Sequence, residues 1–221
     1  MHKIKGATLI ALVITAMIFA SIPVFIPLSR AADSGWTLIS DASNIKAYPS
    51  LHEYIWQKNA SMAPNGLNDK IGLHRLVKTG TTPSEAIFIM PSAFSSPNNS
   101  VYGTNTPEEN WTKTENQSQA IFWANRGFDV YTMETRDYFV SQNFNLSRYA
   151  FNTTQLSFMA NWGWDQWISD MKEAVSKTQE ISGVHKVFMV GISDGGEAVL
   201  NYATQNWKQD IRGIILLDAQ I

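Results

Sequence analysis

Cysteine is absent from this sequence, and its absence excludes several kinds of structure and chemistry. Disulfide bonds, cysteine-ligated metal sites, thiol nucleophiles and a lipidated amino-terminal cysteine all require this residue. The absence carries no information about the redox compartment, because an exported protein can fold without disulfides. Any catalytic nucleophile therefore has to be sought among other residue types.

Charge of either sign is also scarce, since charged residues make up 16% of the chain and the formal net charge is −2. A nucleic-acid-binding surface needs a marked excess of Lys and Arg, so we expect no nucleic-acid partner. The H-E-x-x-H, Walker and G-x-G-x-x-G motifs are missing as well, so we expect no metal and no cofactor. The 221 residues are instead 44% hydrophobic, which suits one globular domain with a core.

A long apolar run lies at the amino terminus. It covers residues 6–28, follows the basic segment 2–5, and precedes a candidate small-x-small cleavage site at 29–31. That order is typical of an export signal, but the run is also close to the length that spans a bilayer. We expect residues 1–31 to be a cleaved signal or a retained membrane anchor, and residues 32–221 to form an extracellular or cell-surface domain. Six glycosylation sequons fit that location, and they begin at Asn59, Asn98, Asn110, Asn116, Asn145 and Asn152.

The stretch from residue 187 to residue 203 carries the strongest functional signal. Residues 187–190 are apolar and typical of a buried strand, residues 191–195 match G-x-S-x-G, and residues 197–203 suit a helix. Strand, tight turn and helix in that order indicate a nucleophile elbow, whose strained turn exposes the Ser193 hydroxyl. Gly191 and Gly195 would avoid the clash that a Cβ would cause. The N–H of Asp194, in the first helical turn, would receive an oxyanion. The alternative is an ordinary glycine-rich turn.

Strand and helix patterns alternate from residue 86 onward, which predicts a parallel sheet with helices on both faces. The continuous apolar segment 86–90 is expected to be a central strand. The expected strands are 36–39, 70–77, 86–90, 128–133, 187–190 and a buried last strand at 213–217. The expected helices are 118–126, 165–180 and 197–206, and irregular structure is expected between residues 39 and 70, at 95–118 and at 136–160.

Three segments together resemble the α/β-hydrolase family, and within it the lipases and esterases. They are the elbow, the strand entry A-N-R-G-F-D-V at 124–130, and the helix and strand of 167–191. The resemblance covers residues 70–221 and implies an α/β fold with a mostly parallel central sheet. It also implies a serine ester hydrolase that forms an acyl-enzyme on Ser193 with an ester or lipid substrate. Residues 91–93 hold the place of the family's oxyanion loop, which implies the N–H of Ala93 as second donor, with that of Phe94 as the next candidate. The alternative is a plain exit from the strand into a loop.

The sequence departs from the family because it lacks the catalytic histidine. The family's triad comes in the order Ser, acid, His along the chain, and no histidine follows Ser193. The four histidines are His2, His52, His74 and His185, and we interpret them as structural or surface residues. Asp218, after the last strand, is a possible triad acid; the alternative is a turn residue. Losing the base costs a serine hydrolase about a millionfold in turnover.

Three readings of the function stay open. The first is the serine ester hydrolase, for which we expect the sequence to be incomplete at its carboxyl end, with the base supplied further on. The second is a catalytically silent surface binding protein, which the missing histidine supports. The third keeps the triad but changes the chemistry to that of a peptidase or acyltransferase of the same fold. Fold analogy alone does not rank these activities.

Three tryptophans, Trp162, Trp164 and Trp167, cluster before the helix expected at 165–180. They could form an aromatic platform for sugars or aromatic esters, but core packing at the helix start is the preferred interpretation. We expect Asp165 and Asp170 to be helix-start or surface groups, and the Glu108–Glu109 pair to lie on a solvated loop.

Overall fold

The computed structural model describes residues 35–45, 48–60, 69–93, 95, 118–143 and 157–219. The chain divides into two units, residues 1–34 and residues 35–221, and the fold below is that of the second unit. The expected signal or anchor at 1–31, Phe94, the Glu108–Glu109 pair and all the sequons except the one at Asn59 lie outside the described residues. In the part of the chain that is described, no helix combines the length and the apolar character needed to cross a membrane.

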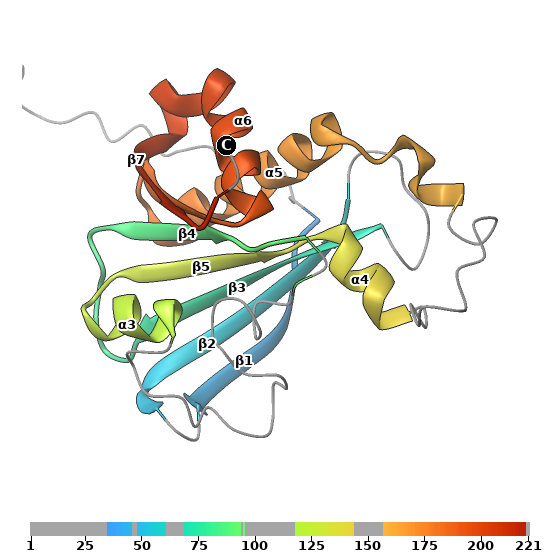
Figure 1. Cartoon of the computed structure of the whole chain (residues 1–221). Helices are drawn as coiled ribbons and strands as arrows, with labels where there is room; N and C mark the ends of the chain where they lie inside the picture. Colours follow the sequence, from blue (N-terminus) through green and yellow to red (C-terminus); the bar gives the residue numbers. More distant parts are fainter. Residues whose placement is uncertain are drawn as a thin grey trace, which may run out of the picture. The chain divides into compact units, whose positions relative to one another are not determined.

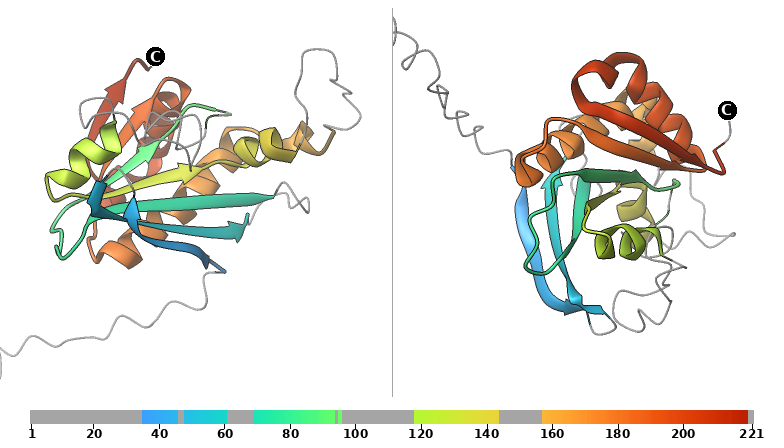
Figure 2. Two further views of the ribbon diagram at one scale, coloured as in Figure 1. Left: turned by 90° about the horizontal axis from the view of Figure 1, so that it is seen from below. Right: turned by 90° about the vertical axis from the view of Figure 1, so that its left-hand side faces the viewer.

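A seven-stranded mixed sheet forms the centre of this unit, in the order β1-β2-β3-β5-β4-β6-β7 (Figure 1). The strands are β1 (Thr37–Ile45), β2 (Tyr48–Asn59), β3 (Lys70–Lys78), β4 (Ala86–Met90), β5 (Asp129–Glu134), β6 (Val187–Ile192) and β7 (Ile211–Leu217). β1, β2, β3 and β5 pair antiparallel, whereas β5, β4, β6 and β7 pair parallel. The sheet twists strongly from β1 to β7, as sheets of L-residues do (Figure 2). The α/β fold class is confirmed.

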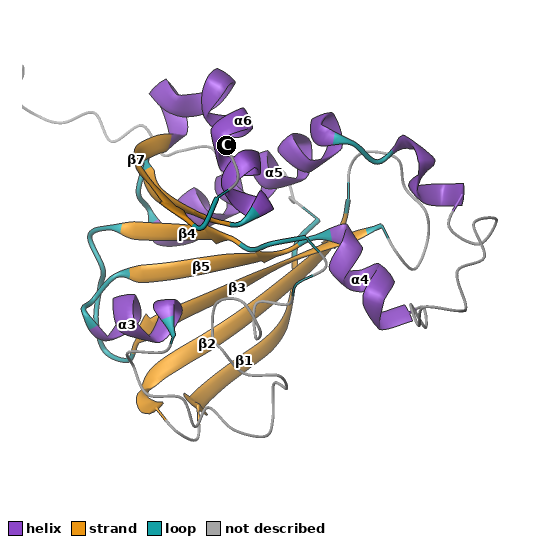
Figure 3. Cartoon of the chain, viewed as in Figure 1, coloured by secondary structure: helices purple, strands orange, loops and turns teal. Residues whose placement is uncertain are grey.

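Helices cover both faces of the sheet (Figure 3). They are α3 (Gln119–Asn125), α4 (Arg136–Asn143), the 3₁₀ turn η3 (Ser157–Asn161), α5 (Trp164–Ser182) and α6 (Asp194–Asp210). The alternation of side chains along β4 assigns the faces, because Phe88 and Met90 pack with α5 and α6 while Ile87 and Ile89 pack with α3. Every residue of β4 is buried, so the expectation of a central strand at 86–90 is confirmed.

Three expectations about secondary structure were wrong. The predicted loop between the first two strands holds β2, whose side chains are mostly half-buried and so give no apolar run. The predicted irregular stretch at 136–160 begins with α4. The last strand is longer than expected and less buried, since Ile214 and Ile215 on β7 are 38% and 37% exposed.

Candidate active site

Ser193 occupies the junction between β6 and α6 with φ 54° and ψ −127°. A non-glycine residue at such a φ is strained by about 1–3 kcal/mol, and the surrounding structure must hold it there. Two backbone bonds do so: the Ser193 N–H donates to the Leu217 carbonyl at the end of β7 (3.0 Å), and the Gly196 N–H donates to the Ser193 carbonyl (2.8 Å). The backbone geometry at this position is the one that the sequence predicted for a nucleophile elbow.

Close backbone approach explains the glycines around Ser193. A Cβ on Gly191 would lie 2.8 Å from the Gly195 carbonyl oxygen, and a Cβ on Gly195 would lie 2.5 Å from the Met90 carbonyl oxygen. A Cβ on Gly196 would overlap the Ala219 side chain. The sequence pattern predicted crowding between Gly191 and Gly195, but it did not reveal that Gly195 also packs against the end of β4.

The predicted oxyanion loop lies next to the elbow, where it contacts the side chain of Asp194. The carboxylate of Asp194 accepts one hydrogen bond from the Ser92 hydroxyl (2.5 Å) and another from the Ala93 N–H (3.3 Å). Ala93 was predicted to donate that N–H to a substrate oxyanion, so in this structure the carboxylate stands in the oxyanion's place. The N–H of Asp194 belongs to the first turn of α6, where helical N–H groups have no intrahelical acceptor.

A cavity of about 290 Å³ lies beside the elbow. Its lining comes from α4, η3, the start of α5 and the start of α6, and consists of Asp137, Met159, Trp162, Gly163, Trp164, Trp167 and Asp194. In open α/β sheets ligands bind at the carboxyl ends of the strands, and the carboxyl ends of β4 and β5 point toward α4 (Figure 1). The cavity therefore lies where ligands bind in folds of this class.

The interpretation of the tryptophan cluster as core packing at the helix start is confirmed for Trp167 and wrong for Trp164. Trp164 is 42% exposed and meets the Trp167 ring edge to face, with ring centroids 5.5 Å apart. Trp167 also packs partly against the core, and Trp162 contacts Phe158 of η3 edge to face. All three indoles border the cavity.

A buried ion pair supports one wall of this cavity. The Arg136 guanidinium on α4 binds both carboxylate oxygens of Asp170 on α5, at 2.7 and 3.0 Å, and both side chains are at most 2% exposed. Burial raises the pKa of Asp170, and the charge and hydrogen bonds of Arg136 offset part of that rise. The same guanidinium carbon lies 5.7 Å from the centre of the Trp162 ring. The prediction that Asp170 is a surface group was wrong, because no polar partner for it stood nearby in the sequence.

None of the three described histidines lies beside Ser193. His52 pairs with Asp41 (2.6 Å), His185 is exposed just before β6, and His74 on β3 lies three strand positions from β6. Three strand spacings amount to about 14 Å, which is beyond proton-transfer reach. The imidazole of His74 is held between Glu53 (3.1 Å) and Glu134 (2.9 Å).

The Glu53–His74–Glu134 cluster shifts the titration of the histidine strongly. Burial by itself lowers the pKa of His74, but the charges and hydrogen bonds of Glu134 and Glu53 outweigh it and raise the pKa to about 10. The sequence placed His74 in an early strand as a structural residue, and its contacts are those of a structural ion cluster.

Asp218, the predicted triad acid, follows β7 directly and has φ 50° with an exposed side chain. The bond between the Ser193 N–H and the Leu217 carbonyl puts Asp218 at the same edge of the sheet as the elbow. A left-handed residue at a strand end also fits the alternative of a turn former. Its role as an acid stays a prediction.

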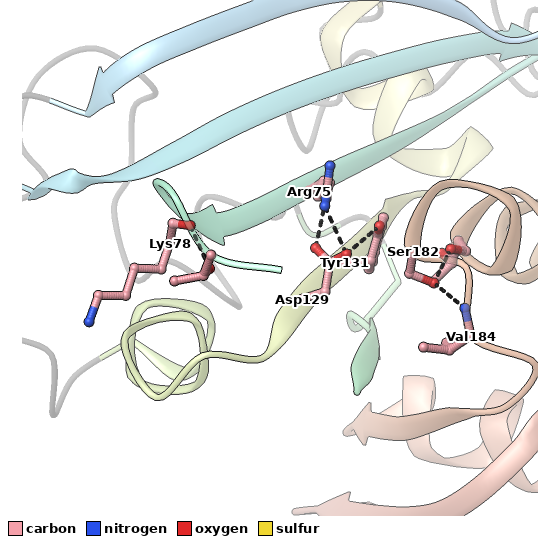
Figure 4. A network of polar contacts seen from close by, with 8 residues as sticks. Arg75, Lys78, Asp129, Tyr131, Ser182 and Val184 are labelled. Carbon is pink, nitrogen blue, oxygen red and sulfur yellow. Dashed lines mark hydrogen bonds and ion pairs between the residues drawn. The ribbon is translucent and has the colours of Figure 1, made fainter. Parts of the chain in front are cut away.

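Another polar network lies on the antiparallel side of β5 (Figure 4). Arg75 donates two hydrogen bonds to the carboxylate of Asp129 (2.7 and 3.0 Å), and the Tyr131 hydroxyl donates a third (2.9 Å). Burial and the negative charge of Asp129 raise the pKa of the Tyr131 hydroxyl. Because each of these groups has its partner, the network suits a structural role.

Comparison with known proteins gives matches among solved structures. No protein-family model and no curated protein sequence matches the chain. A candidate lipase from Sulfolobus solfataricus is 33% identical with a TM-score of 0.71, and the match covers 83% of this chain and 49% of that one. The chain thus spans about half the length of the Sulfolobus protein.

Two more distant structures have the same fold. Candida antarctica lipase A in its closed state is 11% identical, with a TM-score of 0.51 over 86% of this chain and 43% of that one. A candidate acetyl xylan esterase from Bacteroides fragilis is also 11% identical, with a TM-score of 0.50 over 76% and 44%. At these identities the likeness concerns the fold alone.

Proposed function

The chain belongs to the α/β-hydrolase family, and on that premise we propose that it supplies the nucleophile of a serine ester hydrolase. The observation that carries the proposal is the left-handed backbone of Ser193 between β6 and α6. Strain of this kind concentrates at functional sites, where it exposes a reactive group. The similarity to the candidate lipase from Sulfolobus solfataricus supports an ester or lipid as substrate.

The proposed reaction uses an acyl-enzyme. The Ser193 Oγ attacks the acyl carbon, and the N–H groups of Asp194 and Ala93 stabilise the oxyanion of the tetrahedral intermediate. Collapse of that intermediate expels the alcohol, and water then releases the acid from Ser193. The Ala93 N–H becomes available only when the Asp194 carboxylate gives up its 3.3 Å hydrogen bond.

A serine nucleophile also needs a base that takes its proton. His52, His74 and His185 are placed away from Ser193, so the proposal assigns the base to a group other than these three. Asp218 remains the proposed acid that would orient the base, because it lies at the same sheet edge. Imidazole added from solution can substitute for a base in the test below.

The test is covalent labelling by a fluorophosphonate probe, with mass spectrometry of the labelled peptide. We expect the label on Ser193 in the presence of added imidazole, its loss in Ser193→Ala, and its retention in Ser176→Ala, an exposed serine on α5. Hydrolysis of 4-nitrophenyl acetate should follow the same pattern. The proposal fails if Ser193 stays unlabelled with imidazole present, or if Ser193→Ala hydrolyses the ester as fast as the unchanged protein.

A catalytically silent binding protein is the second candidate function. Two observations favour it: the Ala93 N–H is already bonded to Asp194, and the described histidines lie away from Ser193. It predicts that no probe reacts under any condition while the cavity still binds a ligand. A panel of short and long acyl esters against peptides separates an esterase from a peptidase or acyltransferase.

The amino-terminal pattern adds a proposal about location. The basic start and apolar run of residues 1–31 support export, either as a cleaved signal or as a membrane anchor. Fractionation of the native host and sequencing of the mature amino terminus test this. Recovery of the protein in the soluble cell interior with residues 1–31 intact contradicts it.

A further inference from the structure

We propose that the cavity beside Ser193 binds a small organic cation, best fitted by a quaternary ammonium group. If Ser193 is the nucleophile, the preferred ester carries this cation in its alcohol part. The substrate preference rests on the proposed function, whereas binding of the cation does not. The juxtaposition that carries the proposal is three indoles and two carboxylates around one cavity of about 290 Å³.

The aromatic walls are the first argument. The Trp164 and Trp167 rings meet at 84°, so they form a corner rather than a flat stack. A cation is attracted to the negative face of an indole, and tryptophan is the strongest of the aromatic side chains in this respect. Trp164 is 42% exposed, so a ligand can reach this corner from solvent.

The charge of the lining is the second argument. Among the lining residues that the structure describes, the charged side chains are Asp137 and Asp194, and none is Lys, Arg or His. Arg136 lies close to Trp162, but it is 1% exposed and its charge is paired with Asp170. A concave site with charge of one sign and apolar walls concentrates the potential and attracts the opposite charge.

Sugars also stack on tryptophan, so the aromatic walls alone do not decide between a cation and a sugar as ligand. The hydrogen bonds of the lining favour the cation. Each oxygen of the Asp194 carboxylate already accepts a hydrogen bond, from Ser92 and from Ala93. These bonds use about half of the acceptor capacity of the carboxylate, so less of it remains for sugar hydroxyls, but they leave the negative charge in place. A quaternary ammonium group needs the charge and the ring faces and offers no N–H, so it matches what remains.

Size is the third argument. Small-molecule sites usually enclose about 300–1,000 Å³, so this cavity is at the lower limit. A compact head group fits such a volume, whereas a long acyl chain or an oligosaccharide exceeds it. The adjacent position of Asp194 and Ser193 in the chain places that head group next to the proposed nucleophile.

The binding experiment compares choline with its uncharged analogue 3,3-dimethylbutanol, using calorimetry and tryptophan fluorescence on the purified protein. Methyl β-xyloside serves as the sugar probe. We expect choline to bind about tenfold or more tightly than the neutral analogue, and to weaken when the salt concentration is raised. The proposal is overturned if choline and 3,3-dimethylbutanol bind equally well, or if the neutral alcohol or the xyloside binds better than choline. It is also overturned if choline does not bind at about 100 mM.

Two matched tryptophan variants locate the site. Trp164→Leu should weaken choline binding by about fivefold, because one ring face is lost. Trp207→Leu on α6 is the control, since Trp207 is 57% exposed and lies outside the cavity lining, and it should leave binding unchanged. Both side chains are exposed, so neither change is expected to prevent folding. An equal effect of the two variants places the cation elsewhere and overturns the assignment.

Kinetics then separates this inference from the proposed function. Acetylcholine should be hydrolysed with a higher kcat/KM than 3,3-dimethylbutyl acetate, and Trp164→Leu should reduce the difference. Choline binding without hydrolysis by Ser193 supports the cation site and contradicts the esterase. Hydrolysis of both esters at equal kcat/KM, without choline binding, supports the esterase and contradicts the cation site.

Discussion

The polar groups of the antiparallel half of the sheet differ from those of the parallel half in whether they are paired with one another or face a cavity. In the antiparallel half, buried and half-buried charges are paired: Glu53 and Glu134 bind His74, and Asp129 binds Arg75. In the parallel half, Ser193 has a strained backbone, and the cavity beside it is lined by acidic and aromatic side chains.

The difference assigns a structural role to the polar groups of one half and chemistry to those of the other. Paired buried charges fix strand positions, although they add little net stability compared with apolar packing. A strained residue persists only where neighbouring structure determines its position, and β4 and β7 provide this at the elbow. Changes in the two halves should therefore affect different measurements, folding in the first and reactivity in the second.

Gly195→Ala should give the largest effect, and it acts on the reactive half. The new Cβ would lie 2.5 Å from the Met90 carbonyl oxygen, so the elbow and β4 must move apart. A displacement of about 1 Å at a nucleophile can cost about 100-fold in rate, and we expect at least that loss in labelling of Ser193. Gly183→Ala is the control, because its φ of 74° adds strain but no atom lies within 4 Å of the new Cβ. Equal labelling rates in the two variants would contradict the role given to close packing at the elbow.

His74→Leu should act on the stabilising half. It leaves the buried carboxylate of Glu134 and the half-buried carboxylate of Glu53 without their cation, and breaking a buried pair typically costs about 3–5 kcal/mol. Chemical denaturation measures the change in the free energy of unfolding. His185→Leu, at an exposed position, should change it by less than about 0.5 kcal/mol. A large loss of Ser193 reactivity in folded His74→Leu would contradict the claim that the antiparallel half affects folding and not reactivity.

The pH dependence of stability gives a graded effect in the same half, and it is smaller than that of His74→Leu over any single pH unit. The pKa of His74 rises from its ordinary 6.5 to about 10 on folding, so protonation favours the folded state. Its contribution is fully present below about pH 6.5 and is lost as the pH rises toward 10. The free energy of unfolding should fall between these values, by at most about 1.4 kcal/mol per pH unit. An equal slope in His74→Leu would show that another group is responsible.

The same division explains what the sequence could and could not reveal. The elbow was predictable because it is local: Gly191, Ser193 and Gly195 lie within one turn, and steric crowding alone requires this spacing. The central strand 86–90 was predictable because burial on both faces leaves a continuous apolar run. Both signals need no knowledge of distant residues.

The missed features depend on partners far away in the chain. β2 is half-buried and gives neither an apolar run nor a clean alternation, so the sequence predicts a loop there. The sequence predicts Asp170 to be a surface group because its partner Arg136 is 34 residues away. The three tryptophans were assigned to the core because hydrophobicity does not distinguish a buried wall from a cavity wall. Only the placement of α4 beside α5 shows that the tryptophans line a cavity.

Ser92→Ala should give the smallest effect, and it tests whether the Asp194 carboxylate blocks the Ala93 N–H at the elbow. The Ser92 hydroxyl holds the Asp194 carboxylate in the position where it occupies the Ala93 N–H. Removing one hydrogen bond to a partly exposed carboxylate weakens that arrangement by about 1 kcal/mol, and this frees the donor more often. Labelling of Ser193 should therefore speed up by about fivefold, while Ser176→Ala leaves the rate unchanged. A slower rate in Ser92→Ala would show that Asp194 positions the loop for catalysis instead of blocking its donor.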